Sequence, residues 1–358
     1  MRPSIQMLNL LLLVFWLNPE TKLFGQPTTS RRSTSTLDRA FLAKTLKMPD
    51  GQDRKYAIYI PPQYDDDPNH KWPVIISLHG SGECGRDGIK QTRVGLPRYI
   101  ARNRNKFPFI TIMPQAHTLW FRGDDANAVL VILEAVSGEY RIDRDRTYIT
   151  GFSMGGFATW ELTMIRPDIF AAAVPICGVG NKAFVSNIKD LPIWAFHGRL
   201  DQNVPVSGSR EPIEALRRLG ANPSYTEYPT VAHKSWDRAY SSKRLWRWLL
   251  KQRRGAPPRT IDYVMPGRVG RVWWLTAQAE GGIKGQARIR AEITEEKRII
   301  LQSSGIAAVA VLPNSRLLEA EDTIEVIWNG KLAYKGTFNN GFAIKADHSA
   351  QSQPAERP

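Results

Sequence analysis

Short apolar runs alternate with amphipathic segments between residue 56 and about residue 250. Several runs are apolar throughout, as is typical of strands buried on both faces of a parallel sheet. The segments between them place apolar residues at helical spacing, for example Val129, Ile132 and Val136. This alternation predicts a doubly wound, mostly parallel α/β sheet. The predicted strands are Tyr56–Ile60, Val74–Leu78, Phe109–Met113, Thr147–Thr150, Ala172–Ile176, Ile193–Phe196 and Ser224–Tyr228.

The pattern changes after the segment Gly255–Arg259, which has the composition of a linker. Short β-type runs separated by turns follow, and Asn329-Gly330 between two of them indicates a tight hairpin. Residues 260–342 are therefore predicted to form a small all-β appendage, and residues 343–358 a disordered tail. The predicted runs are Val272–Ala277, Ala287–Thr294, Ile299–Gln302, Ala307–Leu312, Thr323–Trp328 and Lys331–Phe338.

The amino terminus carries an apolar run, Met7–Leu17, that follows Arg2 and precedes polar residues. The run is too short to span a bilayer comfortably and is typical of a secretory signal peptide. We expect residues 1–25 to be this signal, with an uncleaved anchor as the alternative. Residues 26–40 are expected to be a linker and residues 41–254 the α/β domain. The protein would then be secreted or periplasmic, with no stable membrane span after removal of the signal.

Composition and charge exclude few classes of protein. Apolar residues make up 42% of the 358-residue chain and charged residues 23%, as in ordinary globular proteins. The net charge of +15 favours anionic partners, but the basic residues are scattered and no nucleic-acid motif is present. The densest group, Lys243–Arg254, is predicted to be an amphipathic helix with a solvated basic face; docking of a polyanion is the alternative. Cys84 and Cys177 could form one disulfide or remain free.

The clearest chemical motif is Gly151-Phe152-Ser153-Met154-Gly155. It follows a predicted strand and begins a helical run, which is the context that gives G-x-S-x-G its meaning. A sharp strand-to-helix turn pushes the serine hydroxyl outward, and the two glycines avoid collisions across that turn. The helix amino terminus also favours negative charge beside the serine. We therefore predict that Ser153 is a nucleophile.

A serine hydroxyl needs a base to accept its proton, and in this arrangement acid and base follow the serine in the chain. Of the histidines after Ser153, His348 lies in the tail and His197 ends a predicted strand, where a structural role is expected. His233 lies in a loop between a strand and a helix. We predict that His233 is the base.

The acid should lie beyond the carboxyl end of a parallel strand, where ligands and chemistry gather. Asp201 lies just past such an end and is the predicted acid, holding the imidazole in the correct tautomer. Asp190 precedes its strand, Asp168 is expected to be a solvated loop residue, and Asp237 is a weaker substitute. An oxyanion hole requires two backbone N–H donors. We expect one from Met154 and the other from Ser81, with Gly82 as the next choice.

Five segments together resemble a known family. They are LHGSGE, YITGFSMGGFATW, RPDIFAAAVPICG, LPIWAFHGRLDQNVP and EYPTVAHKSWDRAY. They resemble secreted bacterial α/β-hydrolases of the phospholipase/carboxylesterase type, often labelled predicted peptidases and akin to polyhydroxybutyrate depolymerase-like and feruloyl-esterase-like enzymes. The resemblance covers about residues 50–250 and implies the same nucleophile, acid and base as the residues themselves indicate. The run Cys84-Gly85-Arg86 departs from the simpler loop expected there.

The resemblance also implies that Gln115 and Trp120 lie on a loop bordering the substrate site. Trp236, just after the predicted base, would help to wall the pocket; for both tryptophans, packing in the core is the alternative. We expect hydrolysis of a carboxylic ester, of a small molecule or attached to a polysaccharide, through an acyl-enzyme. We expect no cofactor, no metal and no nucleic-acid partner.

Three alternatives remain open. The first is a serine peptidase of the same fold, which the absence of a substrate-gating segment before the catalytic region disfavours. The second is a feruloyl or acetyl esterase acting on polysaccharide, in which Trp273, Trp274 and Trp328 of the appendage are either exposed to bind sugar or packed in its core. The third is a non-catalytic surface-binding protein, which the intact set of predicted catalytic residues disfavours.

Overall fold

The computed structural model describes residues 28–29, 40–120, 124–312, 316–319, 321–338, 341–346 and 350–351. The predicted signal peptide, residues 1–25, lies outside the described residues. In the described part, no helix has both the length and the hydrophobicity needed to cross a bilayer.

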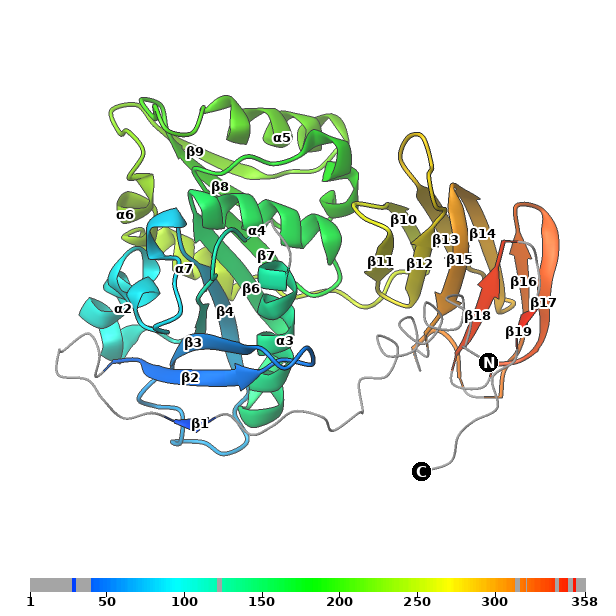
Figure 1. Cartoon of the computed structure of the whole chain (residues 1–358), viewed down its shortest axis with the longest axis horizontal. Coiled ribbons are helices and arrows are strands. Elements are labelled where there is room, and N and C mark those ends of the chain that lie inside the picture. Colours follow the sequence, from blue (N-terminus) through cyan, green and yellow to red (C-terminus); the bar gives the residue numbers. More distant parts are fainter. Residues whose placement is uncertain are drawn as a thin grey trace.

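A nine-stranded sheet forms the larger part of the protein (Figure 1). Its strands from β5 to β9 run parallel in the order β5-β4-β6-β7-β8-β9, while β1, β2 and β3 extend one edge in antiparallel pairing. The strands are β1 (Thr28–Thr29), β2 (Leu42–Lys47), β3 (Asp53–Tyr59), β4 (Trp72–Leu78), β5 (Ile110–Pro114), β6 (Ile142–Phe152), β7 (Ala172–Ile176), β8 (Trp194–Gly198) and β9 (Ser224–Tyr228). The predicted doubly wound, mostly parallel sheet is thereby confirmed.

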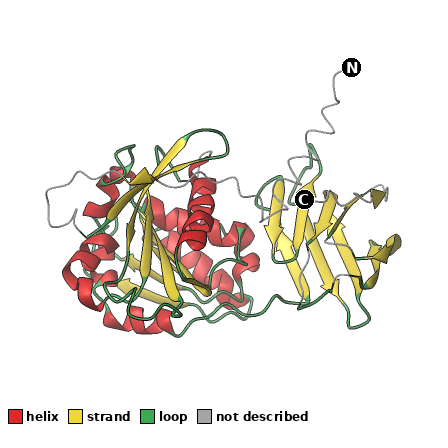
Figure 2. Ribbon diagram, turned by 90° about the horizontal axis from the view of Figure 1, so that it is seen from below, coloured by secondary structure: helices red, strands yellow, loops and turns green. Residues whose placement is uncertain are grey.

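Helices cover both faces of this sheet (Figure 2). Apolar side chains of α3, α4 and α5 pack in one core, and those of α2, α6 and α7 pack in a second core on the other face. Helix α7 buries Leu245, Trp246 and Leu249 and exposes its basic residues, as predicted, but it ends at Leu250 rather than near Arg254. The helices are α2 (Leu96–Asn103), α3 (Asp124–Glu139), α4 (Met154–Ile165), α5 (Ser207–Arg218), α6 (Ser235–Tyr240), α7 (Lys243–Leu250) and the short 3₁₀ helices η1 (Ser81–Glu83), η2 (Lys90–Arg93), η3 (Arg104–Lys106) and η4 (Lys182–Ile188).

The C-terminal part is all-β, as predicted, and consists of two five-stranded sheets around a third core. Trp274 and Trp328 are buried in that core, so these two aromatics pack inside the appendage. One sheet has the order β10 (Thr260–Val264), β13 (Arg288–Ile293), β14 (Arg298–Ser304), β16 (Thr323–Trp328), β17 (Lys331–Thr337). The other has the order β11 (Val269–Val272), β12 (Leu275–Ala279), β15 (Ile306–Val311), β18 (Phe342–Lys345), β19 (Ala350–Gln351).

Two sequence predictions for this part are corrected. The run Val272–Ala277 is not one strand, because Val272 pairs with Leu275 across a two-residue turn in which Trp273 has a φ of 53°. The predicted tail from residue 343 begins inside a strand, since β18 pairs with β15 through Lys345 and β19 pairs with β18. The Asn329-Gly330 hairpin is confirmed, with φ angles of 48° and 82°.

The C-terminal part contacts the end of α4 and helix η4. The side chain of Asn187 in η4 donates to the carbonyl of Val264 at 2.8 Å and accepts from its N–H at 2.9 Å. The hydroxyl of Tyr263 donates to the carbonyl of Ile165 at 2.8 Å. Both contacts lie at the carboxyl end of α4.

Strand β9 forms one edge of the nine-stranded sheet. Its Glu227 accepts hydrogen bonds from Arg210 at 2.7 and 2.8 Å, from Arg199 at 3.0 Å and from the hydroxyl of Tyr225 at 2.9 Å. The bonds from Arg210, assisted by the others, lower the pKa of Glu227 to about 2.

Candidate active site

Ser153 lies at the junction of β6 and α4, in a backbone conformation that few residues adopt. Its φ is 53° and its ψ is −122°. A Cβ on Gly151 would lie 2.3 Å from the carbonyl oxygen of Gly155, and a Cβ on Gly155 would lie 2.2 Å from that of Leu78. Side chains at either position would therefore force the turn open, which explains the two glycines of the motif.

The side chains of Ser153, His233 and Asp201 form one hydrogen-bonded chain. The Nδ1 atom of His233 lies 2.8 Å from Oδ2 of Asp201, and its Nε2 lies 3.0 Å from Oγ of Ser153. Because an ionised carboxylate only accepts, the proton belongs on Nδ1 and Nε2 is free to accept the proton of the serine hydroxyl. The Asp201 side chain is 0% exposed and that of His233 is 19% exposed. The geometry thus presents a buried carboxylate, an imidazole and an alcohol in the order that nucleophilic catalysis uses.

Two loops hold this arrangement together at the carboxyl ends of β8 and β9. The amide of Arg199 donates to Tyr228 at 2.9 Å, and that of Leu200 donates to Val231 at 3.0 Å. The approach is so close that a Cβ on Gly198 would lie 2.2 Å from a carbonyl oxygen of the second loop. The backbone itself therefore fixes the distance between the acid and the base.

The other carboxylates considered as the acid lie elsewhere. Asp237 is exposed on α6, Asp168 forms an ion pair of 2.8 Å with Arg166, and Asp190 precedes β8. Asp168 is buried rather than solvated, so that expectation was wrong. The structure brings only Asp201 of these candidates to His233.

The segment that follows β4 consists of His79, Gly80 and helix η1, and the predicted donors Ser81 and Gly82 are the first two residues of that helix. His79 at the start of this segment is buried, accepts from the amide of Ala116 at 3.0 Å through Nε2, and contacts the carbonyl of Gly80 at 2.6 Å through Nδ1. Burial lowers the pKa of His79 to about 4, so the ring is neutral and acts as a structural clamp. The amide of Met154 belongs to the first turn of α4, whose N–H groups have no intrahelical acceptor.

The side chains predicted to contact substrate are largely enclosed by protein. Gln115 donates to Glu83 and Asp87 and accepts from the amide of Gly88, so it holds the loop after η1. Trp120 is buried and donates to the carbonyl of His79 at 3.0 Å. Trp236 packs edge-on against His233 with ring centres 5.3 Å apart. Of the three, Trp236 contacts His233 directly, whereas Gln115 and Trp120 bind the segment from His79 to Gly88. Contact of all three with substrate stays a prediction.

Cys177 lies beneath the nucleophile, and sequence reasoning assigned it no role. Its sulfur accepts a hydrogen bond of 3.3 Å from the amide of Ser153, and its φ is 40°. Burial raises its pKa to about 12, so the thiol is protonated. Both cysteines are free, which resolves the disulfide question. Among the described residues, only Cys177, Asp201 and His233 bring three metal-binding atoms within 4.8 Å of one another, and two of them already serve the chain to Ser153.

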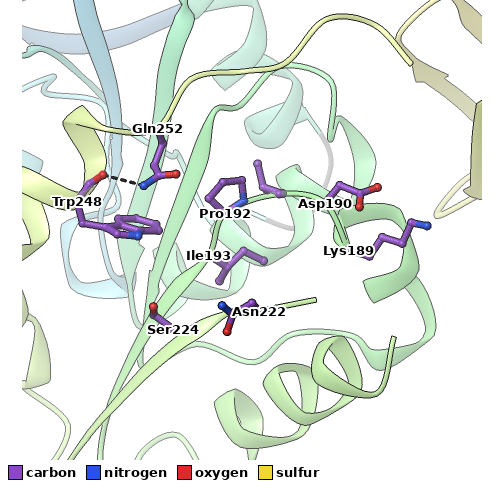
Figure 3. A pocket seen from close by; sticks show the side chains of 9 residues that line it. Lys189, Asp190, Pro192, Ile193, Asn222, Ser224, Trp248 and Gln252 are labelled. Atoms are coloured by element: carbon purple, nitrogen blue, oxygen red, sulfur yellow. Dashed lines mark hydrogen bonds between the residues drawn. The ribbon is translucent and has the colours of Figure 1, made fainter. Parts of the chain in front are cut away.

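A hollow of about 290 Å³ lies at the amino ends of β8 and β9 (Figure 3). Residues before β8, the start of β9 and Trp248 of α7 line it. Because these are the amino ends of the strands, the hollow is separate from Ser153, whose site lies at the carboxyl ends.

The fold and the arrangement of these side chains define an α/β-hydrolase. The sequence profile described as Phospholipase/Carboxylesterase matches residues 126–242. A solved structure titled a thermostable esterase is 34% identical with a TM-score of 0.56, and the alignment covers 64% of this chain and 68% of that one. The chain belongs to the phospholipase/carboxylesterase family and is a carboxylesterase-like hydrolase.

Curated relatives carry more specific names. A probable feruloyl esterase C of Aspergillus niger is 26% identical over 52% of this chain and 69% of its own length. A feruloyl esterase B of Thermothelomyces thermophilus is 30% identical over 34% of this chain and 43% of its own length. The chain therefore spans less than half of the second protein.

Proposed function

We propose that the protein is a secreted serine esterase that cleaves carboxylic esters through an acyl-enzyme on Ser153. The observation that carries the proposal is the hydrogen-bonded chain from the buried carboxylate of Asp201 through His233 to the hydroxyl of Ser153. His233 accepts the serine proton as Oγ attacks the ester carbonyl, and Asp201 stabilises the imidazolium that forms. His233 then donates that proton to the leaving alcohol, and water releases the acyl group by the reverse sequence.

The developing oxyanion would accept hydrogen bonds from the amides of Met154 and Ser81, with Gly82 as the alternative donor. The position of Met154 at the start of a helix of 12 residues supports this, because the helix dipole favours negative charge there. Gln115, Trp120 and Trp236 would shape the walls of the substrate site.

The names of the curated relatives favour an aromatic ester as substrate, either free or attached to a polysaccharide. Secretion rests on the apolar run Met7–Leu17 and its polar flanks. Sequencing the amino terminus of exported protein tests this part: a new terminus near residue 26 supports a cleaved signal, and an intact Met1 supports an anchor.

The test of the reaction combines labelling with turnover. Purified protein is treated with a fluorophosphonate probe, and the adduct is located by peptide mass spectrometry. Hydrolysis of p-nitrophenyl acetate, butyrate and octanoate and of methyl ferulate is measured in parallel. An adduct on Ser153 with turnover supports the esterase, and the ranking of esters identifies the acyl group. Folded protein with neither adduct nor turnover favours the non-catalytic binding protein instead.

A further inference from the structure

Asp201 faces two histidines, not one. Besides His233 at 2.8 Å, its Oδ2 atom lies 3.3 Å from Nε2 of His197. Its Oδ1 atom accepts from the amides of Asn203 and Val204, both at 2.9 Å. The side chains of Asp201 and His197 are both 0% exposed, so His197 and the two amides contact the carboxylate out of reach of solvent.

The partners of His197 fix where its proton lies. Its Nε2 also faces the carbonyl oxygen of Val204 at 3.1 Å, so both neighbours of this nitrogen are acceptors and Nε2 must carry the hydrogen. Its Nδ1 lies 2.7 Å from Oγ of Ser209. Burial lowers the pKa of His197, which keeps the ring neutral. The hydroxyl of Ser209 has one hydrogen and two acceptors in reach, Nδ1 of His197 at 2.7 Å and the carbonyl oxygen of Gly178 at 3.1 Å. A neutral ring protonated on Nε2 has a bare Nδ1, so we assign the hydroxyl hydrogen to this shorter contact.

We propose that His197 is a positioning residue for the reaction: its Nε2–H holds the carboxylate of Asp201 in the orientation that faces His233, and Ser209 holds His197 in the required tautomer. The inference rests on the proposed function, since Asp201 matters to catalysis only if His233 is the base. Around metal ligands, outer partners of this kind fix the orientation and basicity of the ligand, and their loss commonly lowers activity about 10- to 100-fold. We expect an effect at the lower end of that range for Asp201.

Removing the Nε2–H donor has two expected consequences. The carboxylate gains freedom to turn away from His233, which lowers kcat. It also loses one stabilising donor, so its negative charge acts more fully on His233, which is the other titratable group in direct contact with it. The acid limb of the pH profile of turnover should therefore move to higher pH.

Two substitutions separate positioning from packing. His197→Met fills similar volume without a donor, whereas His197→Gln keeps an N–H that can reach Asp201. For His197→Met we expect kcat about 10-fold lower, KM within about twofold, and an acid limb shifted upward by about half a pH unit. His197→Gln should recover most of the loss. Ser209→Ala, a milder change, should give an intermediate effect.

A buried hydrogen bond far from the site provides the matched control. The hydroxyl of Thr163 in α4 is buried and donates only to backbone carbonyls of Thr159 and Trp160. Thr163→Val should lower Tm, like the His197 variants, and leave the acid limb where it is in the native protein. A shift of the limb in this control would attribute the effect to lost stability and overturn the proposal.

A readout without turnover keeps the test separate from the proposed function. Proton NMR of the native protein should show the far-downfield signal of the His233 Nδ1–H bonded to Asp201, and His197→Met should move this signal. If the native protein hydrolyses no ester yet the signal moves, the esterase proposal fails and the positioning role stands. A folded His197→Met variant with the native signal, acid limb and kcat overturns the inference.

Discussion

The hydroxyl of Tyr263 in the C-terminal part donates a hydrogen bond of 2.8 Å to the carbonyl of Ile165, the last residue of the helix that begins beside Ser153. This helix has 12 residues, so its two ends lie about 18 Å apart at 1.5 Å per residue. The appendage therefore meets the hydrolase at the end of α4 that is remote from the nucleophile. We therefore expect the appendage to contribute to stability and not to the reaction with small esters.

A chain ending at Arg254 should keep the kcat of the full chain on small esters within about twofold. Its Tm should fall, because the contacts of Tyr263 and Val264 with the hydrolase part are lost. Thermal unfolding and p-nitrophenyl butyrate hydrolysis check both expectations. A folded but inactive truncated chain would show that the appendage contributes to the site.

Asn187→Ala should weaken the junction without removing the appendage. The asparagine makes hydrogen bonds with both backbone groups of Val264 and donates to the carbonyl of Met164 at 3.0 Å. Losing them should lower the free energy of unfolding by about 2 kcal/mol. Limited proteolysis should also cut more rapidly in the linker around Gly255. Unchanged stability and cleavage would mean that other contacts hold the two parts together.

Replacing Ser153 should remove ester turnover, and the stability of the variant should depend on whether the new residue tolerates the backbone conformation of the turn. Ser153→Ala and Ser153→Gly should each lower ester turnover by about 10⁵-fold or more. The glycine variant should be the more stable of the two by about 1 kcal/mol, because glycine adopts a φ of 53° with a ψ of −122° without strain. Chemical denaturation of both variants measures the difference. Equal stabilities would show that the turn is not strained.

Asp201→Asn should lower kcat by about 10⁴-fold, since an amide cannot stabilise the imidazolium and favours the wrong tautomer. Asp237→Asn is the control, because this exposed residue on α6 is the other carboxylate close to the base in sequence. We expect its kcat to change less than about twofold. The opposite order of effects would assign the acid to Asp237.

Stability should decrease as the solution is acidified from neutral pH, partly because of His79. Burial lowers its pKa from 6.5 to about 4, so below about pH 6.5 the unfolded chain binds a proton that the folded chain does not. Its contribution is fully present above pH 6.5 and declines toward pH 4, by at most about 1.4 kcal/mol per pH unit. The free energy of unfolding, measured by denaturation at several pH values in this range, should change less with pH for His79→Gln than for the native protein. His197 should contribute in the same direction in both proteins. An equal pH dependence of the free energy of unfolding in the two proteins would contradict the role given to His79.

The sequence was sufficient for the buried parallel strands, because continuous apolar runs bounded by polar turns leave little choice of structure. Ala172–Ile176 and Ser224–Tyr228 agree with the structure at both ends. The hairpin at Trp273 was missed because its turn contains two tryptophans and none of the usual turn residues. Strand β18 was missed because a short strand at a polar chain end depends on pairing with its neighbours, here β15 and β19, which the local sequence does not reveal.

Some features of the candidate site could likewise be predicted from the sequence, and others could not. That Ser153, Asp201 and His233 lie together could be predicted, because their positions at strand ends follow from the topology. The contact between His197 and Asp201 could not, because it depends on how the turn after β8 folds back on that strand. The contact between Cys177 and Ser153 could not be predicted either, because Cys177 follows the neighbouring strand β7 and its sulfur reaches Ser153 only in the folded sheet.

Strand β9 leaves one row of backbone N–H and C=O groups facing away from the sheet, which in many proteins invites aggregation by strand pairing. Here Arg199 and Arg210 hold Glu227 on that strand, so an incoming strand would have to strip water from charged groups. Because the pKa of Glu227 is about 2, this protection survives in strongly acidic solution. We therefore expect the ion-pair cluster to oppose strand pairing at β9 under conditions in which most surface carboxylates have lost their charge.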